Sequence, residues 1–183
     1  FSWVTQVRSD VARDPELLDL MRQAGCQVLF IGFESVDPGA LAGMHKSQSL
    51  EEIDRAILEI RKRRIHIHGM FVFGFDADTP ESTRSTVDFA LRKRIDTSQF
   101  LILTPLPGTS LFESLKRENR ILDYDWETYD GHHVKFLPRR FSLWELQKAQ
   151  IMAHARFFRT GLSLESPLPP TRASRAFAKA SQA

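Results

Sequence analysis

Four apolar stretches of the sequence end in residues that could bind a ligand. The first leads to Arg8, the second to Glu34 and Ser35, the third to Gly74 and Asp76, and the fourth to "TPLPGT" at 104–109. A guanidinium and a carboxylate can bind hydroxyl and carboxylate groups, and glycine lets a ligand approach the backbone closely. If the stretches are parallel strands, their carboxyl ends share one edge of a sheet, and these residues form a polar binding floor.

Glu34 raises the sharpest question, because it ends the apolar stretch "VLFIGFES" at 28–35. A charge at the end of a buried strand costs free energy unless water or a partner reaches it. Two interpretations stay open at this point. Glu34 either binds a ligand or forms a buried ion pair with Arg8 or Lys46. The segment 104–109 has a similar alternative, since its two prolines and glycine also suit a rigid turn.

Other residues with chemical potential favour structural roles. His66 and His68 alternate with isoleucines and therefore point to one face near the start of a strand. His132 and His133 have no second ligand pair at metal-binding spacing. Cys26 follows a helix stop, where a small buried hydrophobe is expected.

The elements that position these residues alternate between strand and helix. Apolar strands are predicted near 3–8, 27–33, 65–75 and 98–109, and amphipathic helices between them near 14–25, 49–64 and 80–94. Strong start signals support two of the helices, namely the capping box of Ser49 with Glu52 and the Thr79–Pro80 pair. This pattern predicts an α/β fold with four parallel, right-handed βα units whose apolar strands are covered on both faces.

After the fourth unit we expect a short helix at 110–119, a packed irregular excursion at 120–141, and a last helix from Ser142 to about Phe158. The domain division predicted from this is a barrel segment at 1–115, a C-terminal extension at 116–160 and a disordered tail at 161–183. The tail is rich in Pro, Ser and Ala, a composition that does not build a core.

Composition narrows the class of protein. The 183 residues carry 25 Lys+Arg against 23 Asp+Glu, which is too balanced to argue for a nucleic-acid partner. There is no apolar run of the roughly 20 residues that a membrane span requires. A single cysteine excludes an internal disulfide framework and fits a reducing cytoplasm.

The same residues resemble a known family. The order "IGFES", then "LAGMHKS" (41–47), an amphipathic helix, "MFVFGF" (70–75) and "ILTPLPGT" (102–109) resembles the later half of the radical S-adenosylmethionine (radical SAM) core. The closest resemblance is to the cobalamin-binding members, and it covers roughly residues 1 to 160. It implies a partial TIM-type barrel of six βα units, of which this chain would supply the last four.

The resemblance also implies cofactors and residue roles. In this family a 4Fe-4S cluster binds SAM and cleaves it to a 5′-deoxyadenosyl radical, and cobalamin members often transfer a methyl group. Glu34 and Ser35 match the strand end that addresses the SAM ribose, and Lys46, with Arg8, matches a basic site for the SAM carboxylate. The remaining matches are backbone positions expected near the adenine: Phe73, Gly74, Leu103, Thr104 and Pro105. An acidic residue that some relatives carry in the third strand is replaced by Met70 and Phe71.

One departure from the family is large. The family's "CxxxCxxC" loop is absent, and one cysteine cannot hold a 4Fe-4S cluster. The expectation is therefore a chain that lacks the first two units and any cobalamin domain, inactive alone, as a fragment, a split subunit or a remnant. Its partners would be the N-terminal half of the barrel and a small-molecule substrate that the sequence does not identify. The alternative is a non-catalytic SAM- or nucleotide-binding module. An unrelated βα enzyme with a phosphate site is disfavoured, because no glycine-rich phosphate motif opens a helix.

Overall fold

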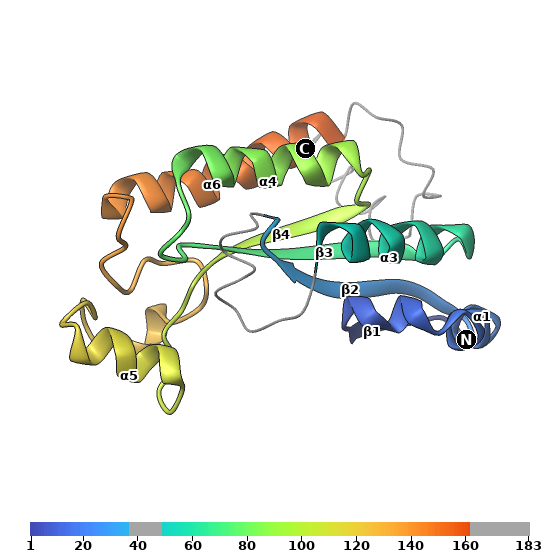
Figure 1. Cartoon of the computed structure of the whole chain (residues 1–183), viewed down its shortest axis with the longest axis horizontal. Helices are drawn as coiled ribbons and strands as arrows, with labels where there is room; N and C mark the ends of the chain where they lie inside the picture. Colours follow the sequence, from blue (N-terminus) through green and yellow to red (C-terminus); the bar gives the residue numbers. More distant parts are fainter. Residues whose placement is uncertain (37–48, 162–183) are drawn as a thin grey trace, which may run out of the picture.

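The computed structural model describes residues 1–36 and 49–161 of the chain. Four parallel strands form one sheet whose spatial order follows the sequence (Figure 1). They are β1 (Trp3–Val7), β2 (Cys26–Glu34), β3 (His66–Phe73) and β4 (Thr97–Ile102). The prediction of an α/β fold with four parallel βα units is confirmed. Sequential parallel strands joined by helices are the construction of a TIM-type barrel, of which this sheet is an arc.

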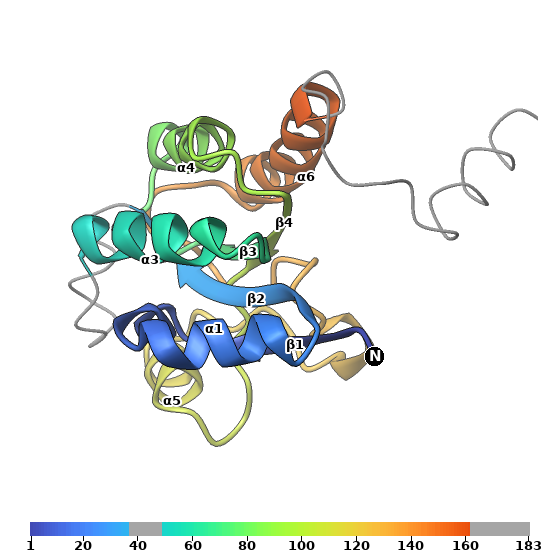
Figure 2. The same ribbon diagram turned by 90° about the vertical axis from the view of Figure 1, so that its right-hand side faces the viewer.

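Three helices cover one face of the sheet, as Figures 1 and 2 show from two directions. They are α1 (Pro15–Gln23), which follows the short 3₁₀ helix η1 (Ser9–Arg13), then α3 (Leu50–Lys62) and α4 (Pro80–Arg92). The predicted caps are present: the backbone N–H of Glu52 donates to Ser49 Oγ, and that of Ser82 donates to Thr79 Oγ1. Side-chain acceptors at these positions satisfy N–H groups that would otherwise lack a partner at the helix start.

The core lies between the sheet and these helices. Alternate strand residues such as Leu29, Ile31, Ile67 and Phe100 have no exposed surface. The residues between them, on what we call the inner face, are mostly half-buried. The expectation of a sheet covered on both faces thus holds for one face among the described residues. In a barrel the inner face is covered by side chains from strands on the opposite side of the lumen.

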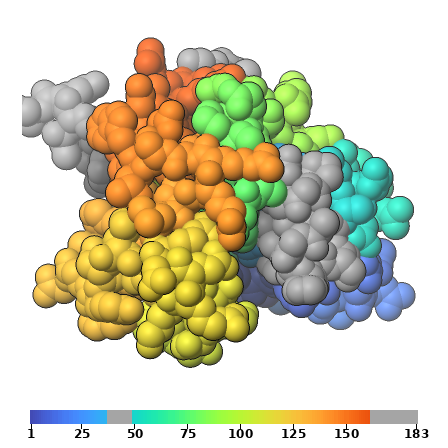
Figure 3. All heavy atoms as spheres, turned by 60° about the vertical axis from the view of Figure 1, so that its left-hand side comes forward, coloured from blue at the N-terminus to red at the C-terminus, as the bar shows by residue number. Residues whose placement is uncertain are grey.

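The C-terminal extension packs against the carboxyl end and the outer edge of β4. It follows α5 (Ser110–Arg117) and contains η2 (Trp126–Thr128) and α6 (Leu143–Gly161), with a β-bridge between Ile121 and Phe136. A capping box of Ser142 with Glu145 begins the last helix, whose start was predicted at Ser142. In Figure 3 the yellow and orange surfaces of residues 110–161 adjoin each other and α4. Residues 162–183, which make up nearly all of the predicted disordered tail, lie outside the described residues.

Candidate functional site

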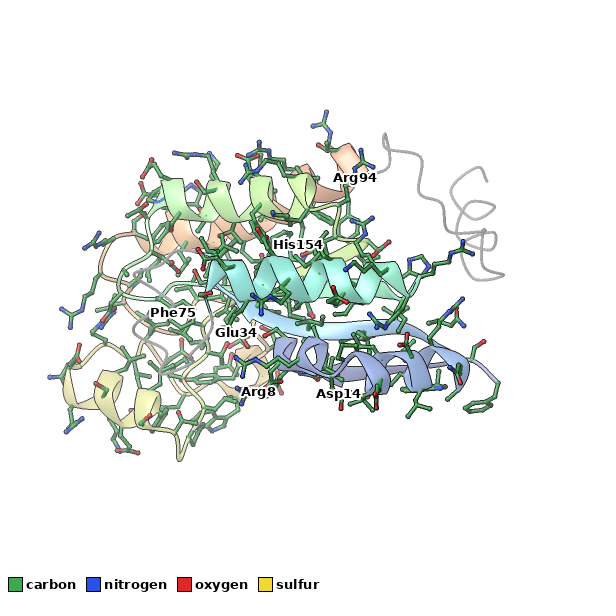
Figure 4. The ribbon with its side chains drawn as sticks, turned by 45° about the vertical axis from the view of Figure 1, so that its right-hand side comes forward. Arg8, Asp14, Glu34, Phe75, Arg94 and His154 are labelled. Carbon is green, nitrogen blue, oxygen red and sulfur yellow. The ribbon has the colours of Figure 1, made fainter. Side chains whose placement is uncertain are left out.

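The predicted polar residues come together at the carboxyl end of the sheet. Arg8 directly follows β1, and Glu34 is the last residue of β2. Arg8, Glu34 and Phe75 lie at one end of the sheet, whereas Arg94 lies at the opposite end (Figure 4). Parallel strands present their carboxyl ends at the same edge, which explains the grouping. Lys46 lies outside the described residues, so its role stays a prediction.

Glu34 has an unusual backbone conformation. Its φ is +62°, in the left-handed region that residues other than glycine rarely adopt. The pairing register shifts at the same point, from Gly32 opposite Met70 to Glu34 opposite Phe71, and the N–H of Ser35 donates to the carbonyl of Phe33 at 2.8 Å. Such strain costs on the order of 1–3 kcal/mol and gathers at functional sites. The strand therefore ends in a tight, strained turn built around the carboxylate.

Gly32 makes room for the Glu34 side chain. A Cβ atom placed on Gly32 would lie 2.6 Å from Oε1 of Glu34, closer than atoms can approach. The carboxylate therefore folds back over Gly32, on the inner face and away from the helices. This position answers the question raised by the sequence, because the charge at the end of the strand points into what would be the barrel lumen.

Arg8 lies on the same inner face. Its neighbour Val7 packs against the core, so strand alternation turns Arg8 the other way. The guanidinium pairs with Asp10 at 3.3 Å, and 75% of the Arg8 side chain is exposed. An exposed ion pair of this kind contributes little stability, about 0–1 kcal/mol. Arg8 can therefore exchange Asp10 for an anionic ligand group at small cost.

The end of β3 is occupied by protein contacts. Asp78, which is buried, accepts hydrogen bonds from the N–H groups of Gly74 and Phe75 at 2.9 and 3.0 Å, and the N–H of Leu103 donates to the carbonyl of Phe73. Gly74 has a φ of +106°, and an added Cβ would lie 3.1 Å from Phe136 and Leu146. The geometry makes Phe73 and Gly74 a packed support on which the extension lies.

The segment after β4 is buried or half-buried at its start and exposed from Leu106 onward. The hydroxyl of Thr104 donates to the carbonyl of Ile102 at 3.0 Å, Pro105 is buried, and Gly108 has open space around its Cα. Leu103 is half-buried at the strand end. Ser35 is buried at 3% exposure, whereas Glu34 is half-buried.

Sequence reasoning missed a row of side chains on the inner face. Strand pairing aligns Gln6, Phe30, His68 and Thr97 across the four strands. The His68 ring lies 4.5 Å from the Phe30 ring, and its Nδ1 is 2.8 Å from Thr97 Oγ1. Burial lowers the pKa of His68, which favours its neutral form. The period-two alternation of "IHIH" was the available signal, but it could not tell which face would be the lumen.

A charge network ties the loop after β3 to the extension. The Asp76 carboxylate accepts hydrogen bonds from Arg120 and Arg139, and Glu118 pairs with both arginines. Burial acts to raise the pKa of Asp76, but the hydrogen bonds and charges of the two arginines outweigh it and leave that pKa lowered. Asp76 was predicted to belong to the binding floor, and the structure gives it partners from residues 116–160 instead.

The described residues do not fit an iron–sulfur cluster. Cys26 is fully buried, and burial raises the pKa of its thiol, which opposes the thiolate that a metal needs. Among residues 1–36 and 49–161 no three His, Cys, Asp or Glu side chains gather as a metal site.

The helices of these described residues lack the combination of length and apolar composition that a membrane span requires. A cytoplasmic location stays a prediction.

Comparisons with known proteins agree with this geometry, although no protein-family model matches. Bacteriochlorophyllide d C-12(1)-methyltransferase of Chlorobaculum tepidum is 37% identical over 139 residues, which are 75% of this chain and 30% of that protein. Hopanoid C-2 methylase of Rhodopseudomonas palustris is 33% identical over 117 residues, which are 63% of this chain and 22% of that protein. The chain thus spans less than a third of the length of these curated relatives.

Solved structures show the same fold. The radical SAM methyltransferase TsrM from Kitasatospora setae, solved with cobalamin and a 4Fe-4S cluster bound, matches 63% of this chain and 23% of its own, with a TM-score of 0.57 and 23% identity. The radical SAM enzyme HemN, coproporphyrinogen III oxidase of Escherichia coli, matches 87% of this chain and 32% of its own, with a TM-score of 0.62 and 15% identity.

Fold and site together define part of a TIM-type (β/α) barrel with a polar site at the carboxyl ends of its strands. The chain belongs to the radical SAM superfamily and corresponds to the later half of its core.

Proposed function

We propose that this chain forms the SAM-binding later half of a radical SAM enzyme that transfers a methyl group. The relatives reported above carry the names methyltransferase and methylase, which supports the reaction class. The observation that carries the proposal is the strained Glu34, whose carboxylate lies on the inner face over Gly32. Bound SAM would supply an activated methyl group on its sulfonium, and the protein would bind and orient it.

Each residue has a role that its chemistry suits. Glu34 accepts hydrogen bonds from the two ribose hydroxyls of SAM, since a carboxylate has two acceptor oxygens. Arg8, with Lys46, binds the SAM carboxylate through charge-assisted hydrogen bonds. The segment Leu103–Pro105 flanks the adenine, and Phe73–Gly74 supports that segment from behind through the bond from Leu103 to Phe73.

A second part of the barrel is the proposed partner. Because the described residues do not fit a 4Fe-4S cluster, we assign the cluster ligands to a segment that carries the first βα units and adds strands at β1. In the described chain β1 pairs with β2 alone, which leaves its other edge available for pairing. Any cobalamin would be bound outside this chain as well. The substrate is a small molecule that enters the lumen beside the row of Gln6, Phe30, His68 and Thr97.

The test is SAM affinity in the assembly that contains both the cluster-bearing segment and this chain. Glu34→Gln keeps the size of the side chain but replaces the two acceptor oxygens of a charged carboxylate with one neutral acceptor and an NH2 donor. We therefore expect the affinity for SAM to fall by about tenfold or more. Glu34→Gly should weaken SAM binding further while leaving stability unchanged or higher, because glycine tolerates the positive φ. Glu113→Gln on the exposed surface of α5 is the matched control. A lower free energy of unfolding in the Glu34 variants, with SAM affinity unchanged, would favour the ion-pair interpretation of Glu34.

A non-catalytic SAM- or nucleotide-binding module is the alternative from another functional class. It predicts that the 183-residue chain binds SAM by itself, without iron. Titration calorimetry of the isolated chain with SAM decides between the two: measurable heat that disappears in Glu34→Gln favours the module. Binding that requires the cluster-bearing segment favours the enzyme.

A further inference from the structure

The outer edge of β4 is closed by side chains and a carbonyl instead of another strand. The N–H of Leu103 bonds toward β3, so by alternation Phe100 and Ile102 direct their N–H and C=O groups the other way. The N–H of Phe100 donates to His154 Nε2 at 3.3 Å, and its carbonyl accepts from Gln150 Nε2 at 3.1 Å. The N–H of Ile102 donates to the carbonyl of Gly131 at 2.7 Å.

The contacts of His154 fix its protonation pattern. Its Nδ1 lies 3.1 Å from the backbone carbonyl of Gln150, which can only accept a hydrogen bond, and 3.5 Å from the side-chain Nε2 of Gln150; the shorter contact with the carbonyl assigns the hydrogen to Nδ1. Nε2 then has a lone pair and accepts from the N–H of Phe100. A doubly protonated imidazole has donors at both nitrogens and no acceptor. Protonation of His154 therefore removes the acceptor for the Phe100 N–H and places two hydrogen-bond donors, that N–H and the Nε2–H, opposite each other.

The surroundings of His154 are largely apolar or uncharged. The Phe100 ring meets the His154 ring edge-on at 5.4 Å, and Phe158 stacks on it at 6.5 Å. From the extension, His132 faces it at 6.4 Å and also contacts Gln150. Among the described contacts of His154, His132 is the titratable neighbour, and Arg156, two residues further along α6, pairs with Asp88 of α4. Gln150 is 5% exposed, so water does not readily replace its bond.

This closure lies immediately before the strand end that the proposed function assigns to SAM. Leu103 lies three positions after Phe100, and the hydroxyl of Thr104 donates back to the carbonyl of Ile102. We propose that His154 and Gln150 are positioning residues that take the place of a neighbouring strand, hold β4 in register, and thereby fix Leu103–Pro105 for SAM binding. Because the bond needs neutral His154, acidification releases β4 and weakens the site. The link to SAM depends on the proposed function, whereas the closure itself does not.

The closure is tested first in the 183-residue chain by hydrogen exchange measured with NMR. We expect the protection of the Phe100 amide, corrected for the intrinsic pH dependence of exchange, to fall by about tenfold on acidification. Its midpoint should match the titration of the His154 ring followed in the same sample. The Ile102 amide, whose acceptor is a carbonyl, is the internal reference and should change less.

Two substitutions separate hydrogen bonding from packing. His154→Gln offers a non-titrating acceptor, and it should keep Phe100 protected and remove the pH dependence. His154→Phe keeps an aromatic ring but has no acceptor, and it should lose protection at every pH. His133→Gln, which removes an exposed imidazole that contacts Asp130, is the matched control and should behave as the unaltered chain.

The positioning role is tested by SAM affinity of the assembly with the cluster-bearing segment, measured across the same pH range. We expect His154→Phe to weaken SAM binding several-fold, by about the value of one lost hydrogen bond, and His154→Gln to restore the affinity with a flat pH profile. If the protection of the Phe100 amide changes neither with pH nor with the two substitutions, the proposed closure is wrong. If that protection changes but the SAM affinity does not, the positioning role is wrong. If the unaltered assembly binds no SAM, the proposed function fails, and the exchange measurement still decides the closure.

Discussion

The two edges of the sheet are built differently. At β4 the outward-facing backbone groups of Phe100 and Ile102 are bonded to α6 and to Gly131, and the ring of Phe100 is fully buried. At β1 no further strand of the described chain pairs with the outer edge, and Val4 is 54% exposed. Unpaired strand edges invite pairing with another chain, and proteins usually protect them. The difference supports the proposal that a further segment adds strands at β1, whereas residues of this chain close the outer edge of β4.

The contrast also locates the candidate site. Arg8 and Glu34 belong to the strands of the open side, and Leu103–Pro105 follow the strand of the closed side. A ligand that contacts both groups would span the sheet from the open edge at β1 to the edge at β4 that α6 closes. Strand addition at β1 would therefore complete the lumen beside Arg8 without disturbing the packing around β4.

Removing the Phe100 ring should have the largest effect. Its ring packs 5.6–5.9 Å from the rings of Phe71, Phe73 and Phe157, at the meeting point of β3, β4 and α6. We expect Phe100→Ala to lower the free energy of unfolding by about 3–5 kcal/mol. Val4→Ala at the open edge should cost well under 1 kcal/mol, because its side chain is already exposed. Chemical denaturation of the two variants measures the difference, and similar costs would contradict the proposed contrast.

Proline substitutions should separate the two sides of β1. The N–H of Trp3 donates to the carbonyl of Gly25, which directly precedes β2. By alternation, the backbone N–H and C=O of Thr5 also point toward β2, whereas those of Val4 point toward the outer edge of the sheet. Thr5→Pro removes a ladder hydrogen bond and should cost about 2–3 kcal/mol. Val4→Pro should cost less than about 1 kcal/mol, since proline is tolerated on an outer edge.

The same pair tests the proposed partner. Val4→Pro should block strand addition at the open edge and reduce association with the cluster-bearing segment, as measured by co-purification and light scattering. Normal association of the folded Val4→Pro variant would show that the partner does not extend the sheet at β1.

Neutralising Asp76 should have a smaller effect than Phe100→Ala or Thr5→Pro, because half of its side chain is exposed. Asp76→Asn should lower the free energy of unfolding by about 1 kcal/mol at neutral pH, the value of a surface charge network. The pKa of Asp76 is lowered in the folded state, so the network stabilises the protein above the usual carboxyl pKa. That contribution is lost as the pH falls through the lowered pKa.

The measurement is denaturation of the unaltered chain and Asp76→Asn from neutral pH down through the lowered pKa of Asp76, below which both carry an uncharged side chain at this position. The difference in free energy should close in acid. Glu127→Gln, at an exposed position of the extension, is the control. A difference that persists in acid would assign the loss to packing or hydrogen bonding and not to charge.

Much of this architecture was determined by the sequence. Hydrophobic periodicity and the caps at Ser49 and Thr79 specify where helices and strands form, because these signals act within a few residues. Four apolar stretches that all end in polar or glycine-containing segments predicted one shared edge, and the structure places Arg8 and Glu34 there. The order of the motifs between Glu34 and Pro105 was sufficient to predict the family.

Only the tertiary structure decided what each polar group contacts. Gly74 and Asp76 were predicted to face a ligand, but contacts with Phe136, Leu146 and Arg120, which are distant in sequence, turn them to the extension. The positive φ of Glu34 and the partners of Phe100 likewise depend on register and on a helix some 50 residues away. Local sequence sets the propensity of each segment, whereas strand alternation and long-range packing determine which face a side chain occupies and whether a backbone edge remains open.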